Sequence, residues 1–369
     1  MGINMKKMAY IILLILTMVL LAGCKKDDNK DKAISDYQPK DTITPKPSEM
    51  PDVATPIPEE THEGEMRSTL TGFWVPEEIG TNRPYAIQFS NFKTVRNQWG
   101  ISQADIVYEA IVEGGITRLL GIGENYSADR IGSVRSSRHY FVSIADEYDA
   151  IYIHYGKTKY AKSKLAEVGI DNLDGETGIG TTVFYRDNKM KAPHNAFGSL
   201  KGILAGIEKK GYETKHPADY EGHYSFYKED TDLTSASIAN KVTLDFSYYT
   251  SPYFTYNSED KLYYRYQFAE AHKDSNIDKQ LTFKNIIIQF VKQRPIDKND
   301  YQTIDFEDAS GSGYYISNGK KVDITWKKNE KNKWMRYYDE SGDELTINPG
   351  KTYIAMFPNK RVEDLVLEK

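Results

Sequence analysis

Residues 314–326 have the sequence YYISNGKKVDITW, and this stretch carries the clearest fold signal in the chain. Residues 314–316 and 322–326 are rich in the aromatic and β-branched side chains that favour strands. Asn318-Gly319 lies between them, and this pair favours the tight two-residue turn that joins antiparallel strands. The stretch therefore predicts a β-hairpin.

The chain around this hairpin has the same strand-and-turn pattern. Strands are expected at residues 242–246, 253–256, 262–267 and 283–291, because each run is rich in strand-forming residues. Ser341-Gly342 predicts a second hairpin between residues 335–338 and 344–347. Residues 226–369 are therefore expected to form a mainly antiparallel β C-terminal domain.

The segment before residue 226 mixes helix and strand patterns. Strands are expected at residues 85–89, 151–155 and 183–185, and helices at residues 138–148, 159–168 and 199–210. In the last helix Leu200, Ile203, Leu204 and Ile207 form one apolar face. Residues 70–225 are expected to form a mixed α/β N-terminal domain, so the fold class is α+β.

The N-terminus has the pattern of a secretion signal. Lys6 and Lys7 precede an apolar run at residues 8–22, which is short for a bilayer-spanning helix. The run ends at Leu21-Ala22-Gly23-Cys24, which resembles the lipobox of bacterial lipoproteins, where the chain is cut before the cysteine and lipid is attached to it. We expect residues 1–23 to be a signal peptide and palmitate or a similar acyl chain on Cys24 to anchor the protein at the outer face of the cytoplasmic membrane.

Residues 24–69 follow the lipidation site as a polar segment. They contain six of the fourteen prolines of the chain and few apolar residues. Such a segment cannot bury enough apolar surface to offset the entropy of ordering, so a disordered tether is expected.

The composition excludes several functional classes. The chain has 369 residues and a formal net charge of −5, which disfavours binding to nucleic acid. It has one cysteine, so it has neither an internal disulfide nor a multi-cysteine metal site. No motif for a metal or a cofactor is found, and none is expected.

Several motifs resemble the YerB-like lipoprotein family. In the first half they are NRPYA (82–86), SQADIVYE (102–109), VEGGITR (112–118), RSSR (135–138), EYDA (147–150) and APHN (192–195). In the second half they are GSG (311–313), NGK (318–320), ITWK (324–327) and NPGKT (348–352). One departure is the single glycine in Tyr155-Gly156-Lys157, where family members often have two. The resemblance implies a two-part α and β extracytoplasmic lipoprotein of Gram-positive type, and it implies no chemistry, since the family has no settled function.

Residues 104–122 allow two local structures: a hairpin that turns at Gly114-Gly115, or a short helix that ends at these glycines. In both cases a spacing of four places Glu109 and Glu113 on one face. In the hairpin Ile111 would face Arg118, so Arg118 would lie diagonally between the two carboxylates. The two acids are candidates for general acid and base in glycan hydrolysis, for ligand contacts, or for structural partners of Arg118.

Residues 132–139, GSVRSSRH, lead into an expected helix. Free amides at a helix N-terminus attract anions, and Arg135 and Arg138 would add charged donors. Alternatively, Ser136 or Ser137 caps the helix, and the arginines pair with acids of the segment 146–149.

Two histidines are expected where strands and loops meet. His154 lies near the end of an expected strand, and His194-Asn195 lies just before an expected helix, with Arg186 upstream. Each histidine alone is also explained as a hydrogen-bonded structural residue, unless folding brings both into one pocket. The ligand-binding candidates are therefore Glu113, Arg118, Arg135, Arg138, His154, Arg186, His194 and Asn195, and the catalytic candidates are Glu109, Glu113, His154 and His194.

Ten aromatic residues lie between Phe246 and Phe268. They suit sugar rings, protein partners or ordinary strand packing. Together these features indicate a lipid-anchored extracytoplasmic binding or assembly protein of the Gram-positive cell envelope, with cell-wall glycopeptide or envelope proteins as partners. The alternatives are a cell-envelope glycan hydrolase that uses Glu109 or Glu113, and a protein-interaction scaffold. Whether the protein is an enzyme is open at this point.

Overall fold

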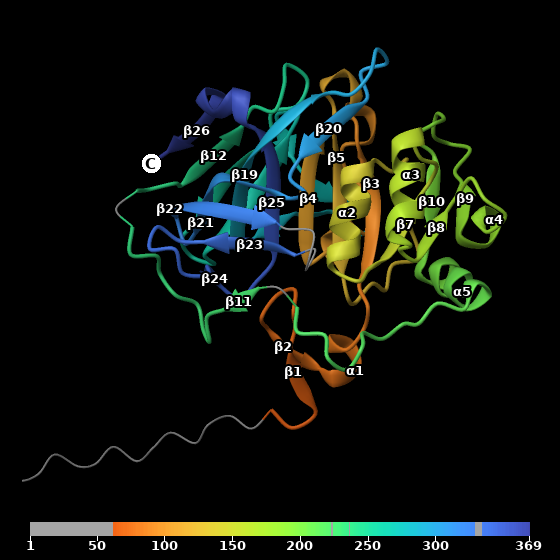
Figure 1. Cartoon of the computed structure of the whole chain (residues 1–369), viewed down its shortest axis with the longest axis horizontal. Coiled ribbons are helices and arrows are strands. Elements are labelled where there is room, and N and C mark those ends of the chain that lie inside the picture. Colours follow the sequence, from red (N-terminus) through yellow and green to blue (C-terminus); the bar gives the residue numbers. More distant parts are fainter. Residues whose placement is uncertain (1–61, 223, 236, 329–333) are drawn as a thin grey trace, which may run out of the picture. The chain divides into compact units, whose positions relative to one another are not determined.

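A computed structural model describes residues 62–222, 224–235, 237–328 and 334–369 (Figure 1). The expected signal peptide, the lipidation site at Cys24 and the expected tether up to residue 61 lie outside the described residues. Within the described residues, no helix has both the length and the apolar character needed to cross a membrane.

The centre of the fold is a mixed sheet of eleven strands in the described part of the chain. Ten strands follow in the order β23 (Met335–Tyr338), β22 (Lys320–Lys328), β21 (Ala309–Ser317), β19 (Asn285–Pro295), β25 (Thr352–Pro358), β4 (Ile106–Ile111), β5 (Thr117–Gly123), β3 (Tyr85–Asn91), β7 (Ile151–His154) and β8 (Asn172–Asp174). The strand β20 (Gln302–Asp305) pairs with β19.

Strand β25 joins the two halves of the chain. It pairs in parallel with β19 on one side and with β4 on the other. Thr352 pairs with Ile106, and Met356 pairs with Ala110. The sheet therefore continues from the mixed first half into the mainly antiparallel second half, and the α+β class is confirmed.

The Asn318-Gly319 hairpin is confirmed. Strands β21 and β22 pair from Ala309 and Lys328 down to Ser317 and Lys320. Asn318 and Gly319 have φ angles of 51° and 74°, and two successive positive φ values are typical of the turn that favours Asn-Gly.

The second expected hairpin forms only in part. A turn is present, because Gly342 donates its amide to the Asp339 carbonyl and Tyr338 forms a bridge with Glu344. However, β24 (Thr346–Ile347) pairs in parallel with β11 (Ser225–Phe226) and not with β23.

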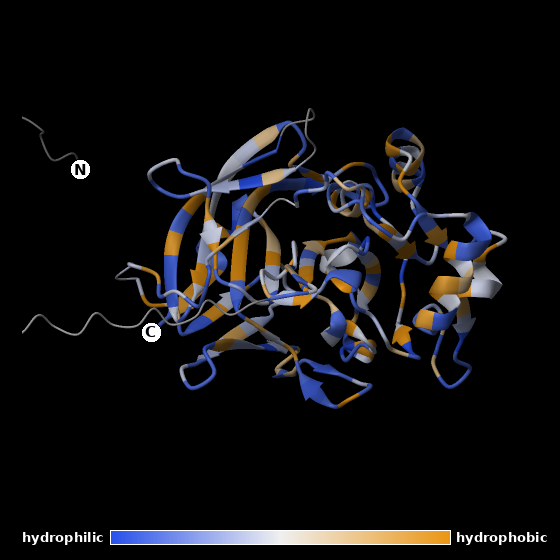
Figure 2. Ribbon diagram, turned by 90° about the horizontal axis from the view of Figure 1, so that it is seen from below, coloured by the Kyte–Doolittle hydropathy of each residue, from blue (hydrophilic) through white to orange (hydrophobic). Residues whose placement is uncertain are grey.

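A second sheet packs against one face of the central sheet. Its strands follow in the order β15 (Glu270–Ala271), β14 (Leu262–Gln267), β13 (Tyr253–Asn257), β12 (Lys241–Leu244) and β26 (Leu365–Glu368), and β18 (Thr282–Phe283) pairs with β14. Phe254 and Phe283 lie with their ring centroids 4.7 and 5.6 Å from that of Tyr353 in β25. Hydrophobic and hydrophilic residues alternate along several strands (Figure 2). In β12, for example, Val242 and Leu244 are buried and Lys241 and Thr243 are half-buried, as expected where one face of a sheet is buried.

Helices cover both faces of the central sheet around β3 and β7. The helices are α1 (Glu77–Gly80), α2 (His139–Glu147), α3 (Lys159–Val168), α4 (Gly180–Val183) and α5 (Leu200–Lys210). Helices α2 and α3 lie on the face opposite the second sheet, and α5 packs on the other face through Ile203 and Ile207. The three longer helices confirm the expected helices, although Leu204 of the apolar face expected in α5 is exposed. Hydroxyls of Thr158 and Ser199 cap α3 and α5.

Short strands complete the described chain. They form the pairs β1 (Glu65–Arg67) with β2 (Trp74–Pro76) and β16 (Lys273–Asp274) with β17 (Lys279–Gln280), and the sheet of β6 (Ile131–Gly132), β10 (Ala196–Gly198) and β9 (Phe184–Arg186). The strand β1 lies inside the segment expected as tether, so ordered structure begins earlier than the composition indicates. The Arg67 guanidinium lies 4.7 Å from the centre of the Trp74 ring, which contributes to this order.

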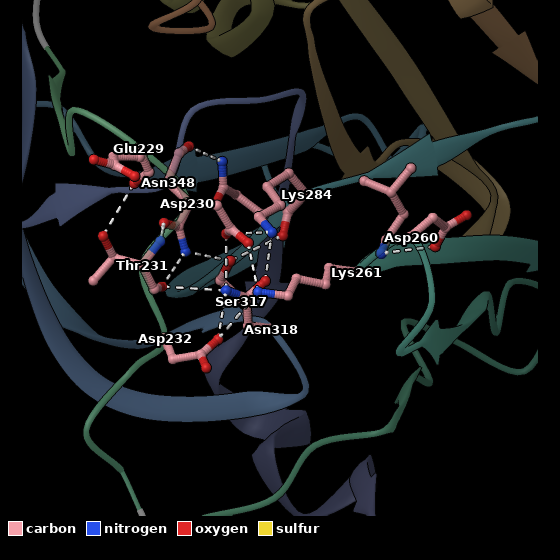
Figure 3. Close-up of polar contacts among 12 residues, drawn as sticks. Glu229, Asp230, Thr231, Asp232, Asp260, Lys261, Lys284, Ser317, Asn318 and Asn348 are labelled. Atoms are coloured by element: carbon pink, nitrogen blue, oxygen red, sulfur yellow. Dashed lines mark hydrogen bonds and ion pairs between the residues drawn. The ribbon is translucent and has the colours of Figure 1, made fainter. Parts of the chain in front are cut away.

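The segment that connects the two halves is held by a polar network (Figure 3). Asp230 accepts hydrogen bonds from Lys284 and Asn318, and it forms an ion pair with Lys261 at 2.9 Å. Asn348 binds both the amide and the carbonyl of Thr231, at 2.7 and 2.8 Å. The family-motif residues Asn318 and Asn348 therefore have a structural role here.

Candidate functional site

Four arginines and a histidine gather at the ends of three strands in the first half. We call Arg118, Arg135, Arg138, Arg186 and His194 the basic cluster. Strands β3, β4 and β7 run in the same direction and end at residues 91, 111 and 154. Arg118 in β5 lies opposite Ser90 near the end of β3. The carboxyl ends of parallel strands are a common place for ligand sites.

Backbone and side-chain contacts hold the arginines of the basic cluster together. Arg118 and Arg138 both donate to the carbonyl oxygen of Ser136. Arg135 donates to the carbonyl oxygen of Pro193, the residue before His194, at 2.6 Å. Arg186 donates to Oδ1 of Asn195, the residue after His194, at 2.8 Å. The expected residues from four separate segments are thus brought together.

Among the described residues, Arg138 is the one arginine of the basic cluster that binds a carboxylate. Its Nε and Nη2 donate to the two oxygens of Glu113, with 2.6 Å for the first bond. The expectation that Arg138 pairs with an acid at 146–149 is wrong. Glu147 instead binds Lys328 in the core, and Asp149 binds Arg83.

The expected serine cap of α2 is also absent. Arg138 precedes the first residue of the helix, and no side chain caps it. The Ser137 hydroxyl accepts a hydrogen bond from the Tyr152 hydroxyl at 2.9 Å. The backbone carbonyl oxygens of Ser136 and Ser137 instead accept hydrogen bonds from Arg138.

Arg118, Arg135 and Arg186 have no ion pair with any described residue. Of the other described arginines, only Arg67 shares this state. The remaining ones each bind a carboxylate: Arg83, Arg96, Arg130, Arg138, Arg265, Arg294, Arg336 and Arg361. Unpaired guanidinium groups are therefore concentrated in the basic cluster.

The arginines of the basic cluster repel one another. Burial lowers the pKa of Arg118 well below its ordinary value, and Arg138 and Arg135 lower it further. Burial, Arg138 and Arg186 lower the pKa of Arg135. Arginine stays charged at neutral pH, so the basic cluster holds four positive charges. Among the described residues, Glu113 is the one carboxylate that is bonded to any of them. An anion bound here would relieve this repulsion.

His194 is fixed inside the basic cluster. Its ring stacks on Phe92 with 4.8 Å between centroids and an interplanar angle of 13°. Its Nδ1 lies 3.4 Å from the Ser90 hydroxyl. Burial, Arg135 and Arg118 lower the pKa of His194 to about 4, so the imidazole is neutral at pH 7.

His154 belongs to a different network. It is fully buried, and its Nδ1 donates to the Gly156 carbonyl at 2.9 Å and lies 3.7 Å from Asp174. Burial lowers the pKa of His154. None of these contacts in the described chain is shared with His194, so the structure does not bring the two histidines into one constellation.

Glu109 and Glu113 do not share a face, and that expectation is wrong. In the hairpin Ile111 pairs with Thr117, and Ala110 pairs with Arg118, one residue away from the expected register. Glu113 lies in a short 3₁₀ turn, Glu113–Gly115. A one-residue shift moves every side chain to the opposite face, so Glu109 points away from Arg118.

Glu109 instead joins the central sheet to the second sheet. It is fully buried and accepts hydrogen bonds from Arg265 in β14 at 2.6 Å and from Tyr353 in β25 at 2.7 Å. Thr117 and Asn91 donate to its other oxygen at 2.5 and 3.1 Å. The carboxylate is fully occupied by structural partners.

The second half of the chain contacts the turn that carries Glu113. The Gly114 amide donates to Asp300 at 2.8 Å, and the Tyr248 hydroxyl donates to the Gly114 carbonyl at 3.3 Å. Tyr248 is 90% exposed and extends the site's border beyond the first half. Sequence reasoning missed these contacts, as well as the Ser90 contact of His194, because they join residues more than 100 positions apart.

Other features of the described chain lie apart from the basic cluster. A cavity of about 710 Å³ in the second half is lined in part by Asp323, Asp339 and Glu340, and no basic-cluster residue lines it. Within the described residues, no group of three or more metal-ligating side chains is found.

Comparisons with known proteins agree with the motifs. Residues 70–213 match the N-terminal domain, and residues 242–354 the C-terminal domain, of a family described as "Protein of unknown function (DUF3048)". The protein named "Putative lipoprotein YerB" of Bacillus subtilis (strain 168) is 29% identical over 302 residues, which are 80% of this chain and 87% of YerB. The crystal structure of YerB from Bacillus subtilis has a TM-score of 0.73 and 28% sequence identity, and the match covers 82% of this chain and all of that one. The chain thus belongs to the DUF3048 family, which confirms the YerB-like resemblance of its motifs and relates it to a lipoprotein of unknown function.

Proposed function

We propose that the protein is an extracytoplasmic lipoprotein of the Gram-positive cell envelope that binds an anionic, cell-wall-related glycan through the basic cluster. The lipobox-like motif at Cys24 and the name of the Bacillus relative support the anchor. The binding function rests on one observation: Arg118, Arg135 and Arg186 are held close together without a carboxylate partner in the described chain.

The argument for a ligand is energetic. Folding ordinarily pairs a buried charge, because an unpaired one costs several kcal/mol. Arg118 is such a buried charge, and it donates to a backbone carbonyl, which carries no net charge. The half-buried Arg135 repels Arg118, and the exposed Arg186 repels Arg135. An arrangement that is costly in the free protein is favourable in a complex that supplies negative charge.

The experiment is a thermal unfolding titration of the protein with solubilised Gram-positive cell-wall fragments. A ligand at about 100 times its dissociation constant stabilises the native state by roughly 2.7 kcal/mol, which is a measurable shift of the midpoint. Arg135→Gln removes one charged donor and is expected to weaken binding by about 1.5–3 kcal/mol.

The control variant is Arg294→Gln, which changes the net charge equally at an exposed arginine that is paired with Asp305. It is expected to bind as the wild type does. Equal loss in both variants would reduce the effect to net charge, and the absence of any shift in the wild type would refute the proposal. In that last case protein partners at the exposed Tyr248 region would be the next ligands to test.

A further inference from the structure

We propose that the basic cluster takes a tetrahedral dianion, a terminal phosphomonoester of an envelope glycan, and that His194 takes up one proton when this group binds. The inference rests on the proposed function and adds the class of the bound group and a coupled proton.

The arrangement of the arginines favours a phosphoryl group over a carboxylate. Arg118 comes from β5, Arg135 from the loop between β6 and α2, and Arg186 from the end of β9. A carboxylate offers two oxygens in one plane and a single charge. A phosphoryl group offers more oxygens around a tetrahedral centre and up to two charges, which suits donors that approach from several elements. Four guanidinium groups against the one bonded carboxylate, Glu113, also favour the higher charge.

The surroundings of His194 make it the proton acceptor. Arg118 and Arg135 are the charged groups that face its ring, and Ser90 and Phe92 are its uncharged contacts. Phe92 also stacks on Tyr249, with 5.6 Å between ring centroids. A proton on His194 is therefore opposed by two cations in the free protein, and a bound dianion would offset both.

The sign and size of the coupling follow from this. In the free protein burial, Arg135 and Arg118 hold the pKa of His194 at about 4. If the anion restores the ordinary value of 6.5, the complex holds a proton over the range in which the free protein does not. Binding then becomes tighter as pH falls, by roughly 30-fold between pH 8 and pH 5.

Other titratable groups lie near the basic cluster. The rings of Tyr155 and Tyr301 lie 4.6 and 5.9 Å from the guanidinium groups of Arg186 and Arg138. Glu113 is bonded to Arg138, and the Tyr140 hydroxyl donates to the Ile111 carbonyl with its pKa raised by burial. His139 lies next to Arg138 in sequence, and its Nε2 lies 3.0 Å from the Thr303 hydroxyl. The variants Glu113→Gln and His139→Asn serve as controls, because each removes one alternative acceptor of the proton.

The test is calorimetric titration of the protein with sulfate, a tetrahedral dianion whose charge does not change between pH 5 and pH 8. Titrations at pH 5.5 in buffers of different ionisation enthalpy count the protons taken up. The wild type is expected to take up close to one proton per sulfate and to show the roughly 30-fold gain in affinity. His194→Asn is expected to lose both the gain in affinity at low pH and the proton uptake, whatever its affinity at pH 8. His139→Asn, which lies outside the basic cluster, is expected to keep both.

Acetate, inorganic phosphate and N-acetylglucosamine 1-phosphate complete the test at pH 8. Acetate is expected to bind at least tenfold more weakly than sulfate, and the sugar phosphate more tightly than inorganic phosphate. If inorganic phosphate binds as tightly as the ester, the assignment to a glycan is overturned in favour of free phosphate.

The remaining outcomes are distinct. Affinity for sulfate that does not change with pH, or proton uptake that persists in His194→Asn, overturns the coupling. Acetate binding as tight as that of sulfate overturns the phosphoryl assignment. If cell-wall fragments bind and sulfate does not, this inference fails while the proposed function stands, and if neither binds, both fail.

Discussion

Neutralisation of Glu109 should cost this fold several kcal/mol of stability, and Glu109→Gln tests that expectation. The substitution keeps the size of the side chain and removes its charge. The carboxylate accepts bonds from Arg265, Tyr353, Thr117 and Asn91, and both it and Arg265 are fully buried. After the substitution the Arg265 guanidinium stays in the core without its counter-charge.

The expected loss is about 3–5 kcal/mol of unfolding free energy, the range for removal of one partner of a buried ion pair. For a domain of this size that corresponds to a fall of roughly 5–15 °C in the unfolding midpoint. His272 cannot compensate, because its Nδ1 accepts from Arg265 and burial and that arginine hold its pKa well below the ordinary value. Urea unfolding followed by tryptophan fluorescence measures the change.

The matched control is the double variant Glu109→Leu/Arg265→Met. Apolar residues of similar volume leave no charge in the core, so the double variant should be more stable than Glu109→Gln. The reasoning is refuted if Glu109→Gln loses less than about 1 kcal/mol, or if the double variant is the less stable of the two. A Glu109→Gln variant that folds normally but loses hydrolysis of cell-wall glycan would instead support the catalytic alternative.

Three further predictions concern single side chains. Burial and Asp105 raise the pKa of Glu124 to about 7 despite a hydrogen bond with Ser68, so the native state loses stability as pH rises from about 4.5 to 7. Glu124→Gln should therefore be more stable than the wild type at pH 8, by up to about 3 kcal/mol, and equally stable below pH 4. Urea unfolding at both pH values measures the difference. Burial raises the pKa of Asp230, but bonds from Lys284, Asn318 and Lys261 lower it to about 2. The contribution of Asp230 to stability is therefore present above pH 4 and is lost as pH falls toward 2. Asp230→Asn should lower the unfolding midpoint at pH 6 and change it little at pH 2, and an equal loss at both pH values would contradict this role of the Asp230 charge. Without ligand, Arg135→Gln should raise the unfolding free energy by about 0.5–1 kcal/mol, because it removes the repulsion of Arg135 by Arg138 and Arg186. A loss of stability would show that the hydrogen bond from Arg135 to the Pro193 carbonyl contributes more than this repulsion costs.

Local signals in the sequence predicted local structure well. The helix at residues 159–168 and the Asn318-Gly319 hairpin follow from patterns contained within a few residues, and both are confirmed. The same is true of the arginines as a group, since RSSR and the neighbouring motifs drew attention to them. The sequence could not predict that Arg118, Arg135 and Arg186 lack an ion pair, because segments far apart in the chain decide which charges pair.

Register and long-range pairing explain the errors. The Glu113–Gly115 turn takes up one residue more than the hairpin pattern indicates, and this one-residue difference separates Glu109 from Arg118. Strand β25 enters the sheet beside β4 although some 240 residues separate the two segments in the sequence. No local periodicity specifies such a neighbour, so the buried partners of Glu109 could not be named from the sequence.

The two faces of β4 and β5 divide the polar residues of neighbouring motifs into two roles. Glu109 points to the side where the second sheet supplies Arg265, and its charge is neutralised in the core. Arg118 points to the side where α2 begins, and only a backbone carbonyl receives it in the described chain. On the first face each oxygen of Glu109 accepts two hydrogen bonds. On the second face Arg118 lies near Arg135 and Arg138 without an ion pair of its own in the described chain. The repulsion within the basic cluster costs the fold stability, and the anion of the proposed function is what would offset that cost.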